Sequence, residues 1–253
     1  MKKHYLIILF TCLLFFIGNG QFDLFDNSET HYTRVTQEMV QNNDYLNLTF
    51  NGEPWYVHPP LYFWLTSLTT SIFGWSTTVL RIQESLFSTG IVWITYLLGS
   101  LLFTSTIGLI SSLILASSLY IIVLAKLAIF DAHLYFFMIL SLYLIIHAIK
   151  NPTKKQYYYL LAGLATSLGI LTKGPIALVQ QLLYLVPWLI IIKNFKPFKS
   201  PWLWAGLFTS IAIPIPYYTH QLIKHGKPFF DLAFRRAGRS EGGGVPNFRK
   251  FPI

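Results

Sequence analysis

The sequence predicts an all-α protein: a polytopic bundle of about seven transmembrane helices whose first outer loop carries short interfacial helices. Its composition is the first reason, because 53% of the 253 residues are hydrophobic and only 11% are charged. Soluble domains have about 25% charged residues, and a soluble surface of this size would need more of them. The second reason is that apolar runs recur along the chain, with most Lys and Arg residues lying between them.

The net charge of +9 does not indicate nucleic-acid binding. Nucleic-acid-binding domains gather Lys and Arg on one water-facing patch, whereas here these residues separate apolar runs, which suits membrane topology. The single cysteine, Cys12, excludes an intramolecular disulfide and a Cys-based zinc site. Because Cys12 lies within an apolar run, we expect it to be a small buried hydrophobic residue.

The N-terminus, "MKKHYLIILFTCLLFFIG", has the charged start and apolar run of a signal peptide or of a first spanning helix. No A-x-A cleavage site follows it, so we expect an uncleaved helix. Residues 19–60 are polar and mixed. Within them "TRVTQEMVQNN" predicts a short amphipathic helix with Val35, Met39 and Val40 on one face.

The next apolar segment, "LYFWLTSLTTSIFGW", is short for a full span and follows Pro59 and Pro60. We therefore expect it to lie at the membrane interface or to re-enter the membrane. Longer apolar runs predict the remaining spanning helices, at residues 79–98, 105–125, 131–149, 157–172, 175–192 and 202–219.

The distribution of basic residues predicts the orientation of these spans. With Lys2 and Lys3 inside, the loop 19–60 lies outside. The later clusters then fall on the inner side: Lys150, Lys154, Lys155, Lys193, Lys196 and Lys199. We expect a multi-pass protein of the plasma (inner) membrane with its site on the extracytoplasmic side. Residues 1–220 would form the membrane-embedded domain, and 221–253 a basic outer tail that starts a missing C-terminal half.

Acidic residues concentrate in the outer loop. Six of the ten Asp and Glu residues lie there: Asp23, Asp26, Glu29, Glu38, Asp44 and Glu53. Two further ionisable residues, Asp131 and Lys173, fall at the outer ends of predicted helices. Ionisable groups at membrane depth are costly unless paired or hydrated, so they indicate function. The alternative for Asp131 is that it only caps its helix at the interface.

Together these groups predict one reaction class. A carboxylate can act as a general base on an acceptor hydroxyl, and Lys, Arg or His can stabilise a departing phosphate. The basic groups on the predicted outer face are His58, Lys173 and the tail arginines Arg235, Arg236 and Arg239. Transfer of a group from a lipid phosphate uses all of them. If the helix count is off by one, however, the tail is cytoplasmic.

Three segments resemble a known family. The first is "TQEMVQNNDYLNLTFNGEPWYVHPPLYFWLTSLTTSIFG", followed by "LRIQESLFS" with Arg81; the others are "FDAHLYFFMILSLYL" and "LTKGPIALVQQLLYLVP". In order and spacing, from about residue 22 to residue 220, they are similar to membrane glycosyltransferases of the GT-C class. The similarity is to the aminoarabinose transferase and dolichyl-phosphate-mannose protein mannosyltransferase family.

The resemblance implies inverting transfer of a sugar from a polyprenyl-phosphate donor to an acceptor hydroxyl or phosphate on the outer side of the membrane. It implies a first-loop Asp, here Asp26, as the base, assisted by a second carboxylate, Asp131 or Glu29. Lys and Arg side chains, including Arg81, would bind the donor phosphate. The acceptor stays open between a glycolipid, a polymer and a protein. No cofactor is required, and a divalent cation is left open.

The chain departs from the family pattern in three places. Asp26 is displaced by two residues, and Glu29 stands where the second acidic residue of the family is expected, so the base is either Asp26 or Glu29. His58 replaces a Lys, which weakens phosphate binding in principle because an ordinary His titrates near pH 6.5. Family members are also longer, so we expect this chain to be an N-terminal part. We expect Glu84, one helical turn from Arg81, to pair with it.

Two other functions stay open. A transporter or flippase for an anionic lipid would line a path through the bilayer midplane with charged residues. A non-catalytic, truncated remnant would bind lipid phosphate without turning it over. We expect His31 and His133 to make ordinary interfacial contacts and not to bind a metal.

Overall fold

The computed structural model describes residues 2–24 and 27–231, and helices dominate this part of the chain. The helices are α1 (Lys2–Leu13), α2 (Asn27–Gln41), α3 (Leu61–Phe73), α4 (Thr77–Leu102), α5 (Ser105–Ala116), α6 (Leu119–Leu124), α7 (Asp131–Lys150), α8 (Lys155–Lys173), α9 (Ile176–Ile191), α10 (Pro201–Ala212) and α11 (Ile215–Phe230). A two-stranded antiparallel hairpin joins β1 (Thr49–Phe50) to β2 (Glu53–Pro54), and short 3₁₀ turns occupy Pro152–Lys154 and Lys196–Lys199.

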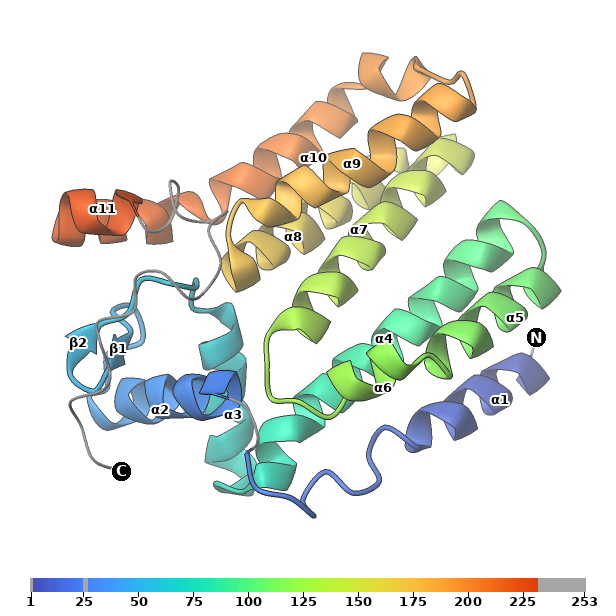
Figure 1. The fold of residues 1–253 in the computed structure, drawn as a ribbon. Coiled ribbons are helices and arrows are strands. Elements are labelled where there is room, and N and C mark those ends of the chain that lie inside the picture. Colours follow the sequence, from blue (N-terminus) through green and yellow to red (C-terminus); the bar gives the residue numbers. More distant parts are fainter. Residues whose placement is uncertain (1, 25–26, 232–253) are drawn as a thin grey trace.

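The long helices form two groups (Figure 1). In one group α8 and α9 pack against α7 and α10 packs against α8, and α4, α5, α6 and α1 form the other. Helix α7 joins the groups because it packs against both α4 and α8. The outer loop, with α2, the hairpin and α3, lies at one end of the bundle. The turns α7–α8 and α9–α10 lie at the other end (Figure 1).

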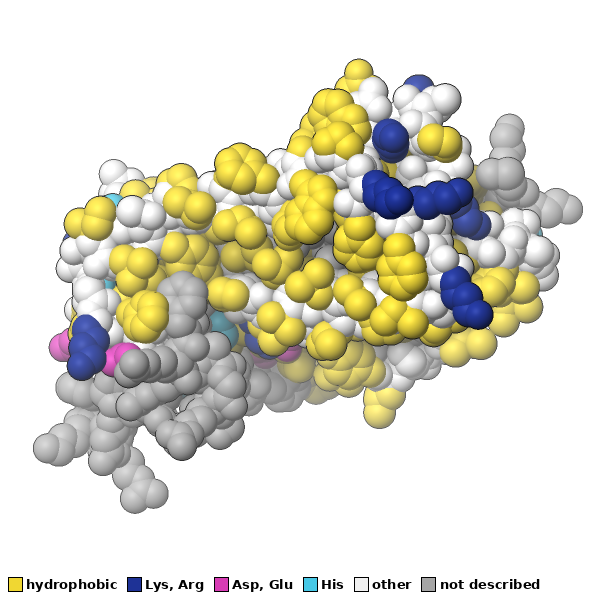
Figure 2. Space-filling model, turned by 90° about the horizontal axis from the view of Figure 1, so that it is seen from above, with side chains coloured by type: hydrophobic (Ala, Val, Ile, Leu, Met, Phe, Trp, Pro, Cys, Tyr) yellow, Lys and Arg dark blue, Asp and Glu magenta, His cyan; other side chains and the backbone are white. Residues whose placement is uncertain are grey.

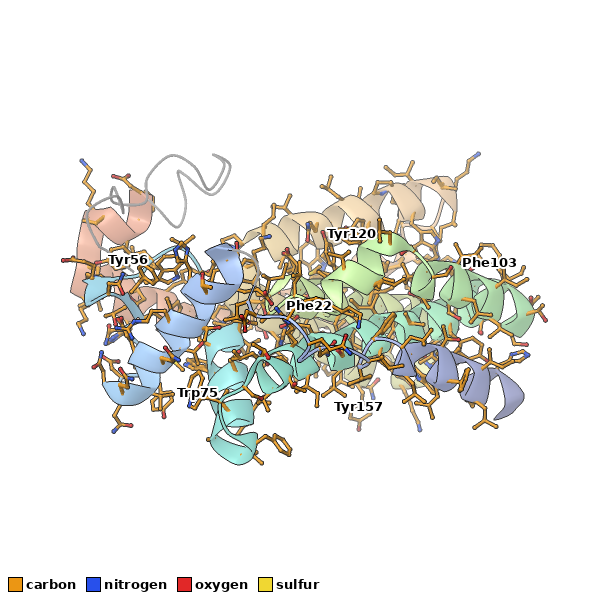
Figure 3. All side chains as sticks on the ribbon, turned by 60° about the horizontal axis from the view of Figure 1, so that its bottom comes forward. Phe22, Tyr56, Trp75, Phe103, Tyr120 and Tyr157 are labelled. Atoms are coloured by element: carbon orange, nitrogen blue, oxygen red, sulfur yellow. The ribbon has the colours of Figure 1, made fainter. Side chains whose placement is uncertain are left out.

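Two of the described helices, α4 and α7, are long and apolar enough to cross a membrane. Trp75 and Phe103, which flank α4, lie at its opposite ends (Figure 3). The run 105–125, predicted as one helix, is divided into α5 and α6 at Ser117, and the Ser118 hydroxyl accepts a hydrogen bond from the Ile121 N–H at the start of α6. The run 202–219 is divided before Pro214, because a proline cannot continue a helical hydrogen-bond ladder. The expected number of spanning helices, about seven, stays a prediction.

The N-terminal apolar run forms α1, which packs against α4 and α5. Cys12 is 1% exposed and belongs to the same apolar cluster as Ile8 and Phe15. This agrees with the expectation for Cys12.

The amphipathic helix of the outer loop, α2, begins at Asn27, earlier than its sequence pattern predicts. Val35 and Met39 are buried as expected, but Val40 is 37% exposed, so its placement on the buried face was wrong. The buried face continues instead through Tyr32, which packs with residues of α3 and with Phe130. Helix α3 starts directly after Pro60. This packing ties the outer loop to the start of α7.

Lys and Arg side chains gather at the end of the bundle away from the outer loop (Figure 2). They belong to the turns between α7 and α8 and between α9 and α10: Lys150, Lys154, Lys155, Lys193, Lys196 and Lys199. This is the arrangement that the positive-inside bias predicts for a cytoplasmic face.

Candidate active site

A partly exposed ion pair joins two of the predicted site residues. Asp131 is the first residue of α7 and Lys173 is the last residue of α8. Since α7 and α8 pack side by side in opposite directions, the start of one meets the end of the other. The Lys173 Nζ donates to Asp131 Oδ1 over 2.8 Å, and their side chains are 32% and 27% exposed. The pair is therefore open to exchange partners with a ligand.

An aromatic ring, that of Phe130, lies beside this pair. The Lys173 Nζ is 4.8 Å from its centroid, a cation–π distance. The ring of His58 lies 4.1 Å from the same centroid, and His58 Nε2 is 3.3 Å from the Tyr32 hydroxyl. Phe130 thus links the outer loop to the ends of α7 and α8. The aromatic residue directly before Asp131 was the sequence signal that could have identified it.

His58 is buried next to a cation. Burial, and then the charge of Lys173, lower the pKa of His58 to about 3. The imidazole is therefore neutral at physiological pH, and it can form hydrogen bonds but supplies no positive charge. Its predicted part in phosphate binding then depends on hydrogen bonding.

A second ion pair, between Glu29 and Arg81, lies fully inside the protein. Arg81 Nε donates to Glu29 Oε1 and Arg81 Nη2 donates to Glu29 Oε2, each over 2.9 Å. The side chains are 2% and 0% exposed for Arg81 and Glu29. Glu29 Oε1 also accepts the backbone N–H of Ala128 over 2.6 Å. Glu29 therefore connects α2 both to α4 and to the segment before Asp131.

The remaining donors of Arg81 hold the chain that leads into α2. Arg81 Nη1 donates to the carbonyl oxygens of Asn19 and Phe22 over 3.0 and 2.9 Å, and Nη2 donates to that of Asp23 over 2.8 Å. A planar guanidinium is suited to such a set of fixed acceptors. In the described structure Arg81 is thus an internal anchor of the outer loop.

The expected pairing of Glu84 with Arg81 was wrong. Arg81 reaches from α4 toward α2, whereas Glu84 faces α7, where its Oε2 lies 3.2 Å from His133 Nδ1. The two α4 residues are one turn apart, but they turn to different neighbours. His133 accordingly contacts a carboxylate inside the bundle, not at the interface.

Four residues predicted to take part in the site lie outside the described part of the chain: Asp26, Arg235, Arg236 and Arg239. Their assignments stay predictions. The structure brings His58, Asp131 and Lys173 together. It pairs Glu29 with Arg81 in the same region, buried inside the protein.

An apolar cavity of about 370 Å³ lies between the two groups of helices. Tyr135, one helical turn beyond Asp131, lines it together with residues of α4, α5, α6 and α9, among them Ile91, Leu115, Tyr120, Leu124 and Tyr184. Tyr120 lies within electrostatic range of Asp131. The Asp131–Lys173 ion pair thus lies near one end of this apolar cavity.

Helix α11 lies against the outer loop. The Tyr56 hydroxyl is 3.0 Å from His225 Nδ1, and Gln221 Nε2 donates to the carbonyl oxygen of Leu46 over 2.5 Å. Figure 3 shows Tyr56 beside α11. The chain beyond residue 220, predicted as an outer tail, therefore starts within α11 on the side of the outer loop.

Within residues 2–24 and 27–231, no group of three or more His, Cys, Asp or Glu side chains could hold a metal ion. His31 packs on the rings of Phe50 and Trp55. The described side chains therefore offer no ready-made cage for a divalent cation.

Two relatives are similar to this sequence over most of its length. An uncharacterized protein of Aquifex aeolicus is 28% identical over 233 residues, which is 92% of this chain and 46% of the relative. The undecaprenyl phosphate-alpha-4-amino-4-deoxy-L-arabinose arabinosyl transferase of Shewanella sediminis is 23% identical over 219 residues, 84% of this chain and 39% of that protein. The chain thus spans less than half the length of these relatives.

A solved structure shares the fold. ArnT from Cupriavidus metallidurans bound to undecaprenyl phosphate has a TM-score of 0.84 at 18% identity, over 92% of this chain and 44% of that one. Its apo state has a TM-score of 0.81.

The family model for dolichyl-phosphate-mannose-protein mannosyltransferases matches residues 57–220, which contain His58, Arg81, Asp131 and Lys173. By this match, which covers more than half of the sequence, the chain belongs to the GT-C glycosyltransferase family that includes the protein mannosyltransferases and the aminoarabinose transferases.

Proposed function

We propose that this chain carries the donor-binding region of an integral membrane glycosyltransferase. The enzyme transfers a sugar from a polyprenyl-phosphate donor to an acceptor hydroxyl or phosphate at the outer face of the membrane. The observation that carries the proposal is the partly exposed Asp131–Lys173 pair near the apolar cavity. The names of the relatives give the donor class, an undecaprenyl phosphate sugar.

Lys173 binds the donor phosphate in this proposal. Its ammonium group donates a hydrogen bond to the carboxylate of Asp131 and lies over the face of Phe130. A phosphate oxygen can replace or join that carboxylate as a charge-assisted acceptor. His58, which is neutral, adds a hydrogen bond, and Arg235 and Arg239 add charge from the tail.

The transfer itself breaks the bond between the anomeric carbon and the phosphate oxygen. The acceptor oxygen attacks the anomeric carbon from the opposite side, and the electron pair of the breaking bond stays on the phosphate. A carboxylate takes the proton of an acceptor hydroxyl. We assign this base to Asp26 by the family resemblance, with Asp131 as the second carboxylate.

Glu29 and Arg81 act as positioning residues in this scheme. Glu29 is buried and takes hydrogen bonds from Arg81 and from Ala128 N, so neither side chain is directed at a substrate. The pair fixes the first turn of α2, through Glu29, and the segment before Asp131. Its role in the scheme is to hold these two segments in place.

The lipid part of the donor occupies apolar space. The cavity of about 370 Å³ is within the size range of ligand pockets, and its lining is apolar apart from tyrosine hydroxyls. The lysines at the opposite end of the bundle support an extracytoplasmic site in the plasma membrane. A transport path receives less support, because the ionisable residues of the site gather at one end of the bundle.

Purified protein in micelles, supplied with undecaprenyl phosphate-α-4-amino-4-deoxy-L-arabinose and a lipid acceptor, tests the proposal through release of undecaprenyl phosphate. Asp26→Asn and Asp131→Asn each lower turnover by about 10²- to 10⁴-fold, the usual contribution of a general base. Lys173→Met weakens binding of undecaprenyl phosphate by about tenfold or more, because a charged hydrogen bond is lost.

Asp23→Asn is the matched control, since Asp23 is an exposed carboxylate of the same loop and uses only its backbone carbonyl to hold Arg81. Its turnover stays at the unsubstituted value. Full turnover in both Asp26→Asn and Asp131→Asn would contradict the assignment of the carboxylates.

A further inference from the structure

Glu84 on α4 and His133 on α7 form a buried pair that the proposed reaction does not use directly. Both side chains are 0% exposed, and Glu84 Oε2 lies 3.2 Å from His133 Nδ1, without the alignment of a hydrogen bond. Within the described part of the chain, neither carboxylate oxygen and neither ring nitrogen has another hydrogen-bond partner. In this part of the chain, each group is therefore the nearest candidate hydrogen-bond partner for the other.

The surroundings of the pair are mostly aromatic. The ring of Phe87 lies 3.9 Å from that of His133, centroid to centroid, and the ring of Tyr62 lies 5.3 Å from it. Two acidic groups, Asp131 on α7 and Glu29 on α2, interact electrostatically with Glu84. Tyr62, on α3, is a further titratable neighbour. The cation on the same helix, Arg81, is already bound to Glu29.

A lone charge at this depth would be strongly unfavourable. A carboxylate and a neutral imidazole that share one further proton carry no net charge, whether that proton sits on the carboxyl group or makes the ring an imidazolium. Breaking such a pair by removing one partner is far more harmful than replacing both. The geometry therefore favours a pair that acts as a unit.

The position of the pair connects it to the site. His133 lies in the first turn of α7, two residues after Asp131, and this helix has no side-chain cap at Phe130. Glu84 lies one turn after Arg81, which anchors the outer loop. Helix α4 thus holds the outer loop with one residue and the start of α7 with another.

We propose that Glu84 and His133 share one proton and act as positioning residues that orient the first turn of α7, and with it Asp131. The expected effect on turnover rests on the proposed function. The pairing of Glu84 with His133 does not depend on it.

The test compares Glu84→Gln, His133→Gln and the double variant in the purified protein. Each single variant lowers kcat for the undecaprenyl phosphate sugar by about 100-fold, because small displacements of a reacting group have effects of this size, while KM changes by less than about twofold. Two amides can hydrogen-bond each other without a titratable proton, so the double variant recovers at least about tenfold in kcat.

Gln181→Leu is the matched control. Gln181 is a buried polar residue of α9, 4% exposed, whose amide also lacks a hydrogen-bond partner among the described residues. Its substitution leaves kcat unchanged. Single variants with unchanged kcat, or a double variant whose loss equals the product of the single losses, would overturn the proposal.

Melting temperatures of the same variants separate this inference from the proposed function. If the unsubstituted protein shows no turnover, the proposed function fails. The pairing still predicts that each single variant melts at a lower temperature and that the double variant regains most of the loss. Additive lowering would overturn the pairing itself.

Discussion

The outer loop and the α7–α8 end both present carboxylates, but they hold them differently. In the loop, Glu29 is 0% exposed and Glu38 is 5% exposed, and each accepts several hydrogen bonds. Asp131, at the start of α7, is 27% exposed and is held by one flexible lysine side chain. Glu29 and Glu38 are thus committed to holding the fold, whereas Asp131 is available to a ligand.

Glu38 and Asp44 show what the loop carboxylates do. Glu38 accepts hydrogen bonds from the Thr49 hydroxyl and from the backbone N–H groups of Asn51 and Gly52, which closes the β1–β2 hairpin onto α2. Asp44 accepts from the N–H groups of the turn that follows it. A concentration of acidic residues therefore does not by itself locate a reacting group. Exposure and the number of fixed partners do.

The largest effect on stability is expected for Arg81→Met. This substitution leaves Glu29 buried without its counter-ion, and we expect it to destabilise the protein by about 3–5 kcal/mol. The measurement is unfolding in micelles. Arg34→Met is the control, because Arg34 is 45% exposed in its ion pair with Glu38 and should contribute less than about 1 kcal/mol. Equal effects of the two substitutions would contradict the division into buried and exposed pairs.

His58 predicts a dependence of stability on acid. Its pKa is lowered to about 3 in the folded protein, from an ordinary value of 6.5. Its neutral form is therefore favoured by folding, so the protein has its full stability above pH 6.5 and loses it as the pH falls toward 3. At pH 5 the loss amounts to about 2 kcal/mol.

His58→Gln should flatten this dependence, since an amide can still bond to the Tyr32 hydroxyl but does not titrate in this range. Melting temperatures between pH 7 and pH 4 provide the measurement. A slope identical to that of the unsubstituted protein would show that other groups cause the acid sensitivity.

The smallest effect is expected for Glu38, a buried carboxylate of the same loop. Burial raises the pKa of Glu38, but hydrogen bonds from Thr49, Gly52 and Asn51 and the charge of Arg34 outweigh it, so the pKa is lowered. Glu38→Gln should therefore cost about 1 kcal/mol and speed amide hydrogen exchange at residues 49–53. Turnover should stay unchanged. A loss of turnover similar to that of Asp131→Asn would place Glu38 in the reaction.

The sequence predicted most of the helices but not their breaks. Helix α7, Asp131–Lys150, agrees with the predicted run 131–149 to within a residue. The break between α5 and α6 was missed, because apolar composition indicates burial in protein or lipid and says little about straightness. The hydroxyls of Ser117 and Ser118 bond to carbonyl oxygens of the preceding turn, and such competition is decided locally.

The part of the site that depends only on the direction of the helices could be predicted from the sequence. Asp131 and Lys173 were expected on one face because their helices run in opposite directions, and the structure pairs them. The pairing of Glu29 with Arg81 spans 52 positions in the chain and depends on how α2 docks on α4, which no local pattern encodes. The same holds for Glu84. Its spacing from Arg81 on α4 suggested a pair between these two residues, but its side chain faces His133 on α7.

The contact between Gly163 on α8 and Gly206 on α10 restricts how this sequence can drift. A methyl group on Gly163 would collide with the backbone carbonyl of Gly206, and one on Gly206 would collide with that of Tyr159. Lys173 lies on the same helix, about 15 Å farther along at 1.5 Å per residue. A single added carbon at either glycine would therefore force α8 and α10 apart and could displace Lys173, although neither glycine lies near Lys173 along the chain.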